Sequence, residues 1–548
     1  MKDWDIQSKA KFEKNKFDLE KLIKVLLENR GLKKEKDVQE FLRPKFKKPS
    51  ANDLGVDKKS LAKSVSRIKK AIKGKQRIII FGDYDVDGIT GTAILWESLD
   101  FLGANAMPYI PHRIDEGYGL SVKGIENVKK QYPDVKLIIT VDNGIVANTS
   151  VDFANSLGID VIISDHHVPG KKLPSAYGIV HSTLICGAAV GWFLSTQLIG
   201  DEFKNDHLAL VALATVADLM KLSSYNRMLL VEGLKDLRAT KRPGLLALLN
   251  ISGVKQEEVG VYEIGHVIGP RINAMGRLES AMDSLRLICT KNPTRAKELA
   301  TRLNDTNLTR QKITFDSFEH AKNLVGKSDK RLLFISHSTY EPGVIGLIAG
   351  KLSEEFYRPA IVASIGKEYT KASARSVAGF NIIEFIRMSS DFLVDAGGHP
   401  GAAGFTVETK KLTELQNFLE KLAETEIKKE LLTRRLRIDC ELELGLIDQK
   451  LFDAINQLVP FGYGNPEPTF TAVGVTISEM RYVGAEQKHL KIVCTQGGRI
   501  MNAILFNYEK SLEVHVGDKV DLAYTISENE WNGVKKLEMK LKDIKTAN

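Results

Sequence analysis

The stretch "RIIIFGDYDVDG" (residues 77–88) decides the fold, because an uninterrupted apolar run leads directly into three carboxylates. The run "RIIIF" is short and rich in β-branched residues, as are "KLIITV" (136–141) and "DVIIS" (160–164). Such runs are typical of strands that are buried on both faces of a parallel sheet. Segments of helical pattern, such as "GTAILWESLDFLG" (91–103), separate them and complete βαβ units. The sequence therefore predicts an α/β domain built on a parallel sheet.

Acidic and histidine side chains follow the end of each predicted strand. The carboxyl ends of strands in an open parallel sheet share one edge, and ligands bind at that edge. We therefore expect these side chains to lie close together. They are Asp83, Asp85 and Asp87 after the first strand, Asp142 after the second, Asp165, His166 and His167 after the third, and Asp218 after a further apolar run.

Carboxylates gathered at one edge without a counter-charge would repel one another and take up protons. Divalent cations remove this conflict, and carboxylate oxygen with imidazole nitrogen suits Mn²⁺ or Mg²⁺. More than four ligands indicate two ions, an arrangement that enzymes use for in-line displacement at phosphorus. Any one of these aspartates could instead form a turn or cap a helix. Their recurrence after consecutive strands is what predicts metal-dependent phosphoester hydrolysis.

Composition and charge narrow the functional class. The 548 residues suffice for roughly three or four domains, and the net charge of +9 favours a polyanionic partner. The four cysteines are far apart in sequence, which predicts free thiols in a reducing cytoplasm rather than a zinc site. The N-terminal residues resemble no signal peptide, and no run of 18 apolar residues predicts a membrane span.

The pattern along the chain predicts five regions. Mixed helix and strand patterns alternate in the middle of the chain, and short alternating strands near the end predict a small β-barrel. The regions are an N-terminal helical region (1–55), a catalytic α/β domain (56–275), connecting helices (276–330), a second α/β domain (331–425) and the β-barrel (430–548).

Several motifs together resemble a known family. "DYDVDG", "VDNG", "DHH" and "VAD" resemble the DHH phosphoesterase superfamily. The ordered set of further motifs resembles its RecJ branch, the 5′→3′ exonucleases specific for single strands. These are "YIPHRIDEGYGL" (109–120), "PRINAMGRL" (270–278), "PGVIGLIAGKL" (342–352), "ASARSVAGFNI" (372–382), "GGHPGAAGFTV" (397–407) and "PFGYGNPEPTF" (460–470).

The resemblance implies a fold and a function. The fold would be a parallel-sheet DHH phosphoesterase domain, a helical connector, an α/β DHH-associated domain and a C-terminal OB-fold β-barrel. The enzyme would use two Mn²⁺ or Mg²⁺ ions to degrade single-stranded DNA to 5′-mononucleotides in DNA repair and recombination. Implied partners are single-stranded DNA, a helicase and single-strand binding protein, with a monomeric enzyme and no membrane contact.

The resemblance also implies a role for each site residue. One ion would be held by Asp85, Asp142, His166 and Asp218, and the second by Asp83 and Asp142, which bridges the two. Asp87 would lie near the site, Asp165 would orient His166, and His167 would contact the scissile phosphate. The substrate-binding residues would be Arg113, Ser373 and Arg375 at the 5′ phosphate, with Arg271, Asn273, Arg277 and His399 as further donors.

One departure and two alternatives stay open at this point. After the "DHH" motif the family usually has an Asn-Pro pair and a longer loop, whereas this chain continues "HSTLICGAAVGWFL" (181–194). The contacts of that loop with nucleic acid are therefore open. The alternatives are a DHH-family oligonucleotide phosphodiesterase or phosphatase, and a non-catalytic single-strand-binding scaffold. The strand-rich tail argues against the first, and the filled ligand positions argue against the second.

Overall fold

The computed structural model describes residues 2–113, 115–200, 206–508, 514–531 and 533–546. The chain divides into two compact units. One is residues 46–432, and the other combines residues 1–45 with residues 433–548. Each is described by itself.

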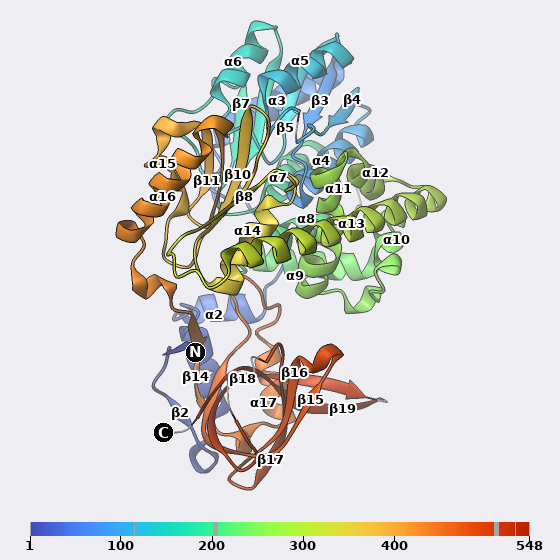
Figure 1. Ribbon diagram of the computed structural model, residues 1–548. Coiled ribbons are helices and arrows are strands. Elements are labelled where there is room, and N and C mark those ends of the chain that lie inside the picture. The colour runs from blue at the N-terminus through green and yellow to red at the C-terminus, as the bar shows by residue number, and fades with distance from the viewer. Residues whose placement is uncertain (1, 114, 201–205, 509–513, 532, 547–548) are drawn as a thin grey trace. The chain divides into compact units, whose positions relative to one another are not determined.

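The unit of residues 46–432 begins with a five-stranded parallel sheet, as the sequence predicts (Figure 1). Helices cover both faces, so Ile78 and Ile80 pack on one side and Ile79 and Phe81 on the other. This explains the uninterrupted apolar run. In spatial order the strands are β4 (Ala106–Tyr109), β3 (Arg77–Phe81), β5 (Val135–Thr140), β6 (Asp160–Asp165) and β7 (Gly178–His181).

The strand order places a topological switch point between β3 and β5. The chain leaves β3 for β4 on one side and returns to β5 on the other, so the loops after β3 and β5 diverge and leave room for a ligand. The helices that surround this sheet are α3 (Lys58–Lys73), α4 (Val86–Phe101), α5 (Val122–Gln131), α6 (Asn148–Ser156) and α7 (Gly187–Ile199).

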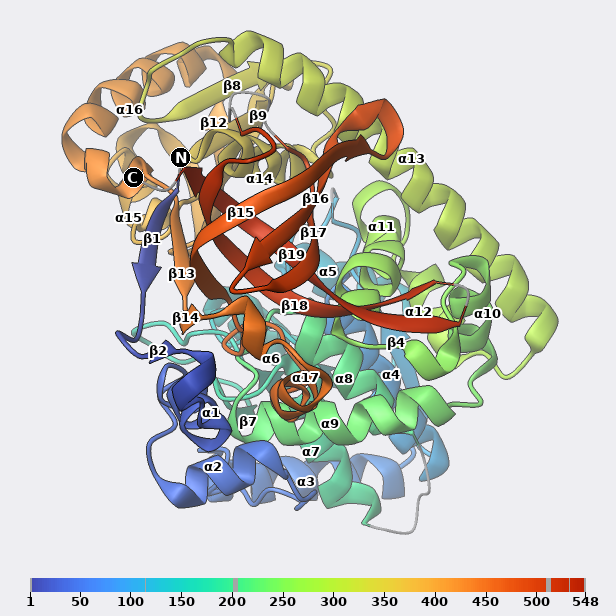
Figure 2. The same ribbon diagram turned by 90° about the horizontal axis from the view of Figure 1, so that it is seen from below.

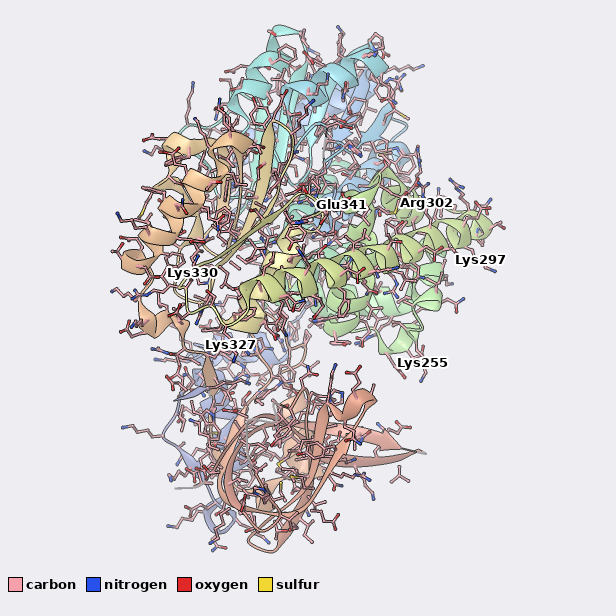
Figure 3. All side chains as sticks on the ribbon, in the orientation of Figure 1. Lys255, Lys297, Arg302, Lys327, Lys330 and Glu341 are labelled. Atoms are coloured by element: carbon pink, nitrogen blue, oxygen red, sulfur yellow. The ribbon has the colours of Figure 1, made fainter. Side chains whose placement is uncertain are left out.

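A helical region follows the sheet, as expected. Its longest helix, α13 (Pro293–Val325), begins where the Asn292 side chain accepts hydrogen bonds from Thr294 N and Arg295 N. Figure 3 labels Arg302 on α13. Its side chain pairs with Glu279 and Asp283 and ties α13 to the preceding helices. The other helices are α8 (His207–Ala217), α9 (Ser224–Ala239), α10 (Pro243–Ile251), α11 (Gly269–Leu278) and α12 (Met282–Cys289).

A second five-stranded sheet completes this unit. Its strands pair antiparallel except for β8 and β9, and helices α14 (Ile345–Phe356), α15 (Ile382–Arg387) and α16 (Leu412–Glu426) accompany it. This matches the expected second α/β domain. The spatial order is β11 (Leu393–His399), β12 (Ala402–Glu408), β10 (Tyr369–Arg375), β9 (Ala360–Ser364) and β8 (Leu333–His337).

The second unit contains the β-barrel that the sequence predicts. Five strands close on themselves because β15 pairs with both β16 and β18, and Figure 2 shows the strands curling around a common interior. Apolar side chains fill it, including Phe470, Leu522 and Tyr524. The strands are β15 (Phe470–Val483), β16 (His489–Gln496), β17 (Arg499–Leu505), β18 (Lys519–Trp531) and β19 (Val534–Thr546).

The N-terminal region differs from the purely helical segment expected over residues 1–55. Besides α1 (Leu19–Glu28) and α2 (Glu35–Leu42), it contains β1 (Asp3–Ile6), which pairs with β13 (Arg435–Ile438). It also contains β2 (Lys11–Phe12), which pairs with β14 (Cys440–Leu442). These strands are very short, and their partners lie more than four hundred residues away in sequence, so local pattern does not reveal them.

Two further expectations concern the whole chain. All four cysteines are free thiols. Within the part of the chain that the structure describes, no helix combines the length and apolar character that a membrane crossing requires.

Candidate metal and phosphate site

The loop after β3 is held by the start of two helices. Asp85 caps α4, and its Oδ1 accepts hydrogen bonds from Asp87 N at 3.0 Å and Gly88 N at 3.1 Å. Asp87 accepts from Gly187 N at 2.7 Å and Ala188 N at 2.6 Å, where α7 begins. A helix N-terminus favours negative charge, so both acids are oriented by backbone donors. The start of α7 lies in the stretch where the chain departs from the pattern of the family that it resembles, and here it positions Asp87.

Asp142 lies directly after β5 in a strained conformation. Its φ of 62° is in the left-handed region, which few residues other than glycine adopt. Its Oδ1 is buried and accepts no hydrogen bond within the described chain, although His166 Nε2 lies 3.1 Å away. A Cβ at Gly187 would lie 2.6 Å from Asp142 Cβ, so only glycine fits there. Strain and an orphaned carboxylate oxygen together mark Asp142 as a functional position.

The remaining acids and a histidine gather around Asp142. His166 Nε2 lies 3.6 Å from Asp87 Oδ2 and 3.7 Å from Asp218 Oδ2. Three sets of residues could each hold an ion, because the donor atoms within each set lie within 4.8 Å of one another. These are Asp83–Asp85–Asp142, Asp87–His166–Asp218 and Asp142–His166–His167.

Carboxylates dominate the electrostatics of this cluster, and the charges of His167 and Arg113 do not offset their repulsion. Burial, followed by repulsion from neighbouring carboxylates, raises the pKa of Asp83 and Asp142 well above the usual range. The same two causes raise the pKa of Asp218 to about 8. Burial also lowers the pKa of His166, which keeps the ring neutral and able to bind a cation. Oxygen donors with one neutral imidazole fit Mn²⁺ or Mg²⁺, and the orphaned oxygen of Asp142 is available to them.

The grouping of the acids differs in detail from the expected one. Asp142 belongs to two sets, as a bridging ligand would. Asp85, however, groups with Asp83 rather than with His166 and Asp218. Asp87, which was expected only near the site, takes the place beside His166 and Asp218. Sequence spacing could not decide this, because Asp85 turns toward the N-terminus of α4 while Asp87 turns toward α7.

Asp165 orients a different histidine from the one expected. Its Oδ1 bonds His167 Nδ1 at 2.8 Å, whereas His166 contributes only its backbone N–H. Burial opposes ionisation of Asp165, but the hydrogen bond and charge of His167 outweigh it and lower the pKa of Asp165. Conversely, burial disfavours the charged ring of His167, but Asp165 raises the pKa of His167 to about 9.

A group of arginines lies near Tyr84 of this loop. The Arg113 guanidinium lies 5.0 Å from the centre of the Tyr84 ring. Burial, and then the charges of Arg113, Arg310 and Arg375, lower the pKa of Arg277 to about 10. Crowded and partly buried guanidinium groups favour an anion among them, and phosphate accepts several such charge-assisted bonds.

The second α/β domain adds donors to this group. Arg375 Nη1 donates to Ser373 Oγ at 3.2 Å on β10. Burial, followed by the charges of Arg375 and His167, lowers the pKa of His399, which connects the glycine-rich hairpin to both residues. Burial also lowers the pKa of Arg271, which donates to Asn304. The expected substrate-binding residues therefore come from both domains of this unit.

Asn273 is placed differently from the expected free donor. Its Oδ1 accepts a hydrogen bond from Val86 N at 2.9 Å, so the side chain supports the first turn of α4. Its immediate contact is thus with the metal-site loop. The motif "PRINAMGRL" could not reveal this, because the contact joins residues 187 positions apart in sequence.

Sequence reasoning missed two features of the site. At the start of α14, a Cβ on Gly346 would come 2.9 Å from Ser373 Oγ and 3.1 Å from Arg375 Nη2. The glycines of "PGVIG" were the available signal, because they let a helix N-terminus approach these donors. The second feature is Tyr118, whose hydroxyl lies 3.0 Å from His167 Nε2. Nothing in its local sequence indicated that contact.

Comparison with protein families gives three matches in chain order. Residues 77–215 match the DHH family N-terminal domain, residues 329–425 match the DHHA1 domain, and residues 438–543 match the RecJ OB domain.

Individual relatives match over nearly the whole chain. The single-stranded-DNA-specific exonuclease RecJ of Bacillus subtilis is 33% identical over 98% of this chain and 70% of its own length. The Escherichia coli protein of the same name is 30% identical over 96% of both chains. The crystal structure of RecJ in complex with Mn²⁺ from Thermus thermophilus aligns with a TM-score of 0.83 at 29% identity, over 97% of this chain and 77% of that one.

Proposed function

Because this chain belongs to the RecJ family and is a metal-dependent exonuclease specific for single-stranded DNA, we propose that it releases 5′-mononucleotides in the 5′→3′ direction. The observation that carries the proposal is the buried, unpaired Oδ1 of Asp142 among carboxylates whose pKa values are raised. Bound cations would offset the repulsion among these carboxylates and favour their ionised form.

Two Mn²⁺ or Mg²⁺ ions fit the donor sets. Asp83, Asp85 and Asp142 would hold one ion, and Asp87, His166 and Asp218 the other. Bound there, the ions would neutralise charge on the phosphodiester and lower the pKa of an attacking water. The unusual φ of Asp142 holds its carboxylate in the first set, with its Oδ1 3.1 Å from His166 Nε2 of the second.

The protein's own groups would hold the scissile phosphate. His167 offers Nε2 to a phosphate oxygen, since Asp165 already occupies Nδ1. Asp165 accepts three further N–H bonds in this region from the backbone of Ile145, His166 and His167, which fix it in place. The ring of His167 is thereby oriented without any contribution from the substrate.

A terminal phosphate site would set the direction of degradation. Arg113, Ser373 and Arg375 form a set of donors for a 5′ phosphate, and Arg277 and Arg271 extend the positive charge along the strand. An end that carries an extra phosphate dianion would bind there more tightly than a hydroxyl end. Cleavage would then proceed from the 5′ terminus.

The biological setting belongs to the same proposal. We assign the enzyme to DNA repair and recombination in the cytoplasm, acting as a monomer beside a helicase and single-strand binding protein. The free cysteines and the net charge of +9 support a reducing compartment and a nucleic-acid partner. The β-barrel would bind single-stranded DNA, as OB folds do.

The test is an exonuclease assay with end-labelled single strands and duplexes in Mn²⁺, in Mg²⁺ and in chelator. We expect 5′-mononucleotides from the single strand only, and none in chelator. Arg113→Ala should weaken cleavage of 5′-phosphorylated ends more than that of 5′-hydroxyl ends, because it removes one phosphate donor. Arg295→Ala, at an exposed arginine near the start of α13, is the matched control.

Three results would contradict the proposal. An intact single strand in every metal would favour a non-catalytic scaffold. Turnover of dinucleotides but not of long strands would favour an oligonucleotide phosphodiesterase. An equal effect of Arg113→Ala on both kinds of 5′ end would remove the docking role of Arg113.

A further inference from the structure

The hydrogen bonds of His167 leave it no free nitrogen. Nδ1 bonds Asp165 Oδ1 at 2.8 Å, and Nε2 bonds the Tyr118 hydroxyl at 3.0 Å. The Asp165 carboxylate only accepts, so Nδ1 carries a proton in this bond. Nε2 then has either one lone pair or one hydrogen, and in both cases it makes a single strong bond. In this structure that bond goes to Tyr118.

A conflict arises from the proposed function, on which this inference rests. There His167 must offer Nε2 to a phosphate oxygen, and that nitrogen is occupied. We infer that the Tyr118 hydroxyl is a placeholder for a phosphate oxygen. It holds the His167 ring in the free enzyme, and it leaves Nε2 when a substrate phosphate binds. Tyr118 is therefore a positioning residue that competes with the substrate.

The backbone around Tyr118 allows this exchange. Gly117 has φ of +83° and Gly119 has φ of +65°, so left-handed glycines flank the tyrosine on both sides. A Cβ at Gly117 would meet nothing within 4 Å. Glycine lowers the barrier to backbone rotation, and two of them make Tyr118 the centre of a short hinged segment.

The side chain of Tyr118 can also leave without opening the core. The residue is 54% exposed, and its ring meets Tyr84 edge-on at 6.2 Å and His167 at 6.0 Å between ring centres. The His167 ring, in contrast, is fixed. Asp165 is only 1% exposed and holds the imidazole through its hydrogen bond to Nδ1. The exchange therefore moves the tyrosine and leaves the imidazole in place.

The test is Tyr118→Phe, which removes the competing hydroxyl and keeps the ring. A net hydrogen bond is worth a factor of about 3 to 10 in an equilibrium constant, so KM for a 5′-phosphorylated single strand should fall by that factor. kcat should not fall. The dissociation constant of a phosphorothioate-linked strand in Mn²⁺, measured by fluorescence anisotropy, should fall by the same factor.

Two controls isolate the exchange. Tyr369→Phe changes a similarly exposed tyrosine at the far end of β10 from Arg375 and should alter neither constant. In a His167→Ala background, Tyr118→Phe should lose its effect on the dissociation constant, because the two residues act on the same bond.

Different results overturn this inference and the proposed function. A lower kcat at unchanged KM would mean that Tyr118 stays on His167 during turnover, and unchanged KM and affinity would mean that no exchange occurs. Either result overturns the placeholder role while the nuclease stands. A wild-type protein that cleaves nothing overturns the proposed function instead, and the anisotropy measurement still decides whether Tyr118 competes with phosphate.

Discussion

Two clusters of acids lie at the two ends of α4, and they are built on opposite principles. At its N-terminal end lie Asp83, Asp85 and Asp87, with Asp142 and Asp218 as their partners. Near its end, Glu97 receives two bonds from Arg242, at 2.6 Å and 2.8 Å, and a third from His207 at 2.9 Å. Arg242 also pairs with Asp206 at 2.6 Å.

The pKa values of the acids in the two clusters are shifted in opposite directions. Burial would raise the pKa of Glu97, but the hydrogen bonds and charges of Arg242 and His207 lower it to about 2. At the other cluster, burial and like charges raise the pKa of Asp218 to about 8. Both clusters contain buried acids, so the number of acids does not identify the metal site. The balance of charge does, because the charges of His167 and Arg113 do not offset the repulsion among the carboxylates of the metal site.

The largest expected effect comes from breaking the unpaired cluster at its centre. Asp142→Asn keeps the shape of the side chain and removes its charge from the Asp83–Asp85–Asp142 set and from beside His166 of the other set. We expect single-strand cleavage in Mn²⁺ to fall by more than about 100-fold, the upper limit for changes in outer-shell partners of a metal. Strand binding should remain, because the arginines are untouched. Initial rates and anisotropy measure the two quantities.

Glu97→Gln is the matched control for Asp142→Asn. It removes one acid charge from the same domain, at the cluster that already has its cation. Cleavage per folded molecule should stay near the wild-type rate. Equal losses of activity in the two variants would mean that the distinction between the clusters is wrong.

The next largest effect concerns the stability of the folded protein and comes from breaking the paired cluster around Glu97. Arg242→Met removes the cation from Glu97 and Asp206 and should lower the free energy of unfolding by about 3–5 kcal/mol, as for other broken buried pairs. Chemical denaturation followed by circular dichroism measures this. Cleavage by the folded fraction should persist, and a stable variant would show that the pair contributes little.

The acid limb of the stability curve should report Glu97. Its pKa is lower in the folded state than the ordinary value of 4.5, so its contribution is complete above about pH 5. The contribution is lost as pH falls from about 4.5 to about 2, and a shift of that size corresponds to roughly 3 kcal/mol. The difference in unfolding free energy between wild type and Glu97→Gln should therefore shrink over that range. A constant difference would contradict the lowered pKa.

Much of the fold could be predicted from the sequence because short apolar runs indicate its buried strands. The apolar runs at 77–81, 136–141 and 160–164 became β3, β5 and β6, and the acids that follow them meet at the switch point. The positions of the acids after β3, β5 and β6 could be predicted from strand order, whereas the apolar run before Asp218 is helix α8, and Asp218 reaches the site from the end of that helix. The pairing of β1 with β13 could not be predicted, because two short strands carry almost no periodic signal.

The orientation of side chains was the part that sequence did not decide. Asp85 and Asp87 are two residues apart, and which of them faces His166 depends on helix N-termini from α4 and α7. Asp165 precedes both histidines, and its choice of His167 depends on ring geometry. Tyr118 reaches His167 across 49 positions. Each of these contacts depends on tertiary packing.

The smallest expected effect compares the two clusters by the stability that bound Mn²⁺ adds to the folded protein. Mn²⁺ at 100 times its dissociation constant should stabilise the folded protein by about 2.7 kcal/mol per site, because binding is linked to folding. Glu97→Gln should keep this gain, measured as a rise in the thermal midpoint on adding Mn²⁺. Asp142→Asn should lose most of it, since its carboxylate belongs to the donor set of one ion and its Oδ1 lies 3.1 Å from His166 Nε2 in the set of the other. A full gain in Asp142→Asn would mean that the ions bind elsewhere, and the orphaned oxygen would then need another partner.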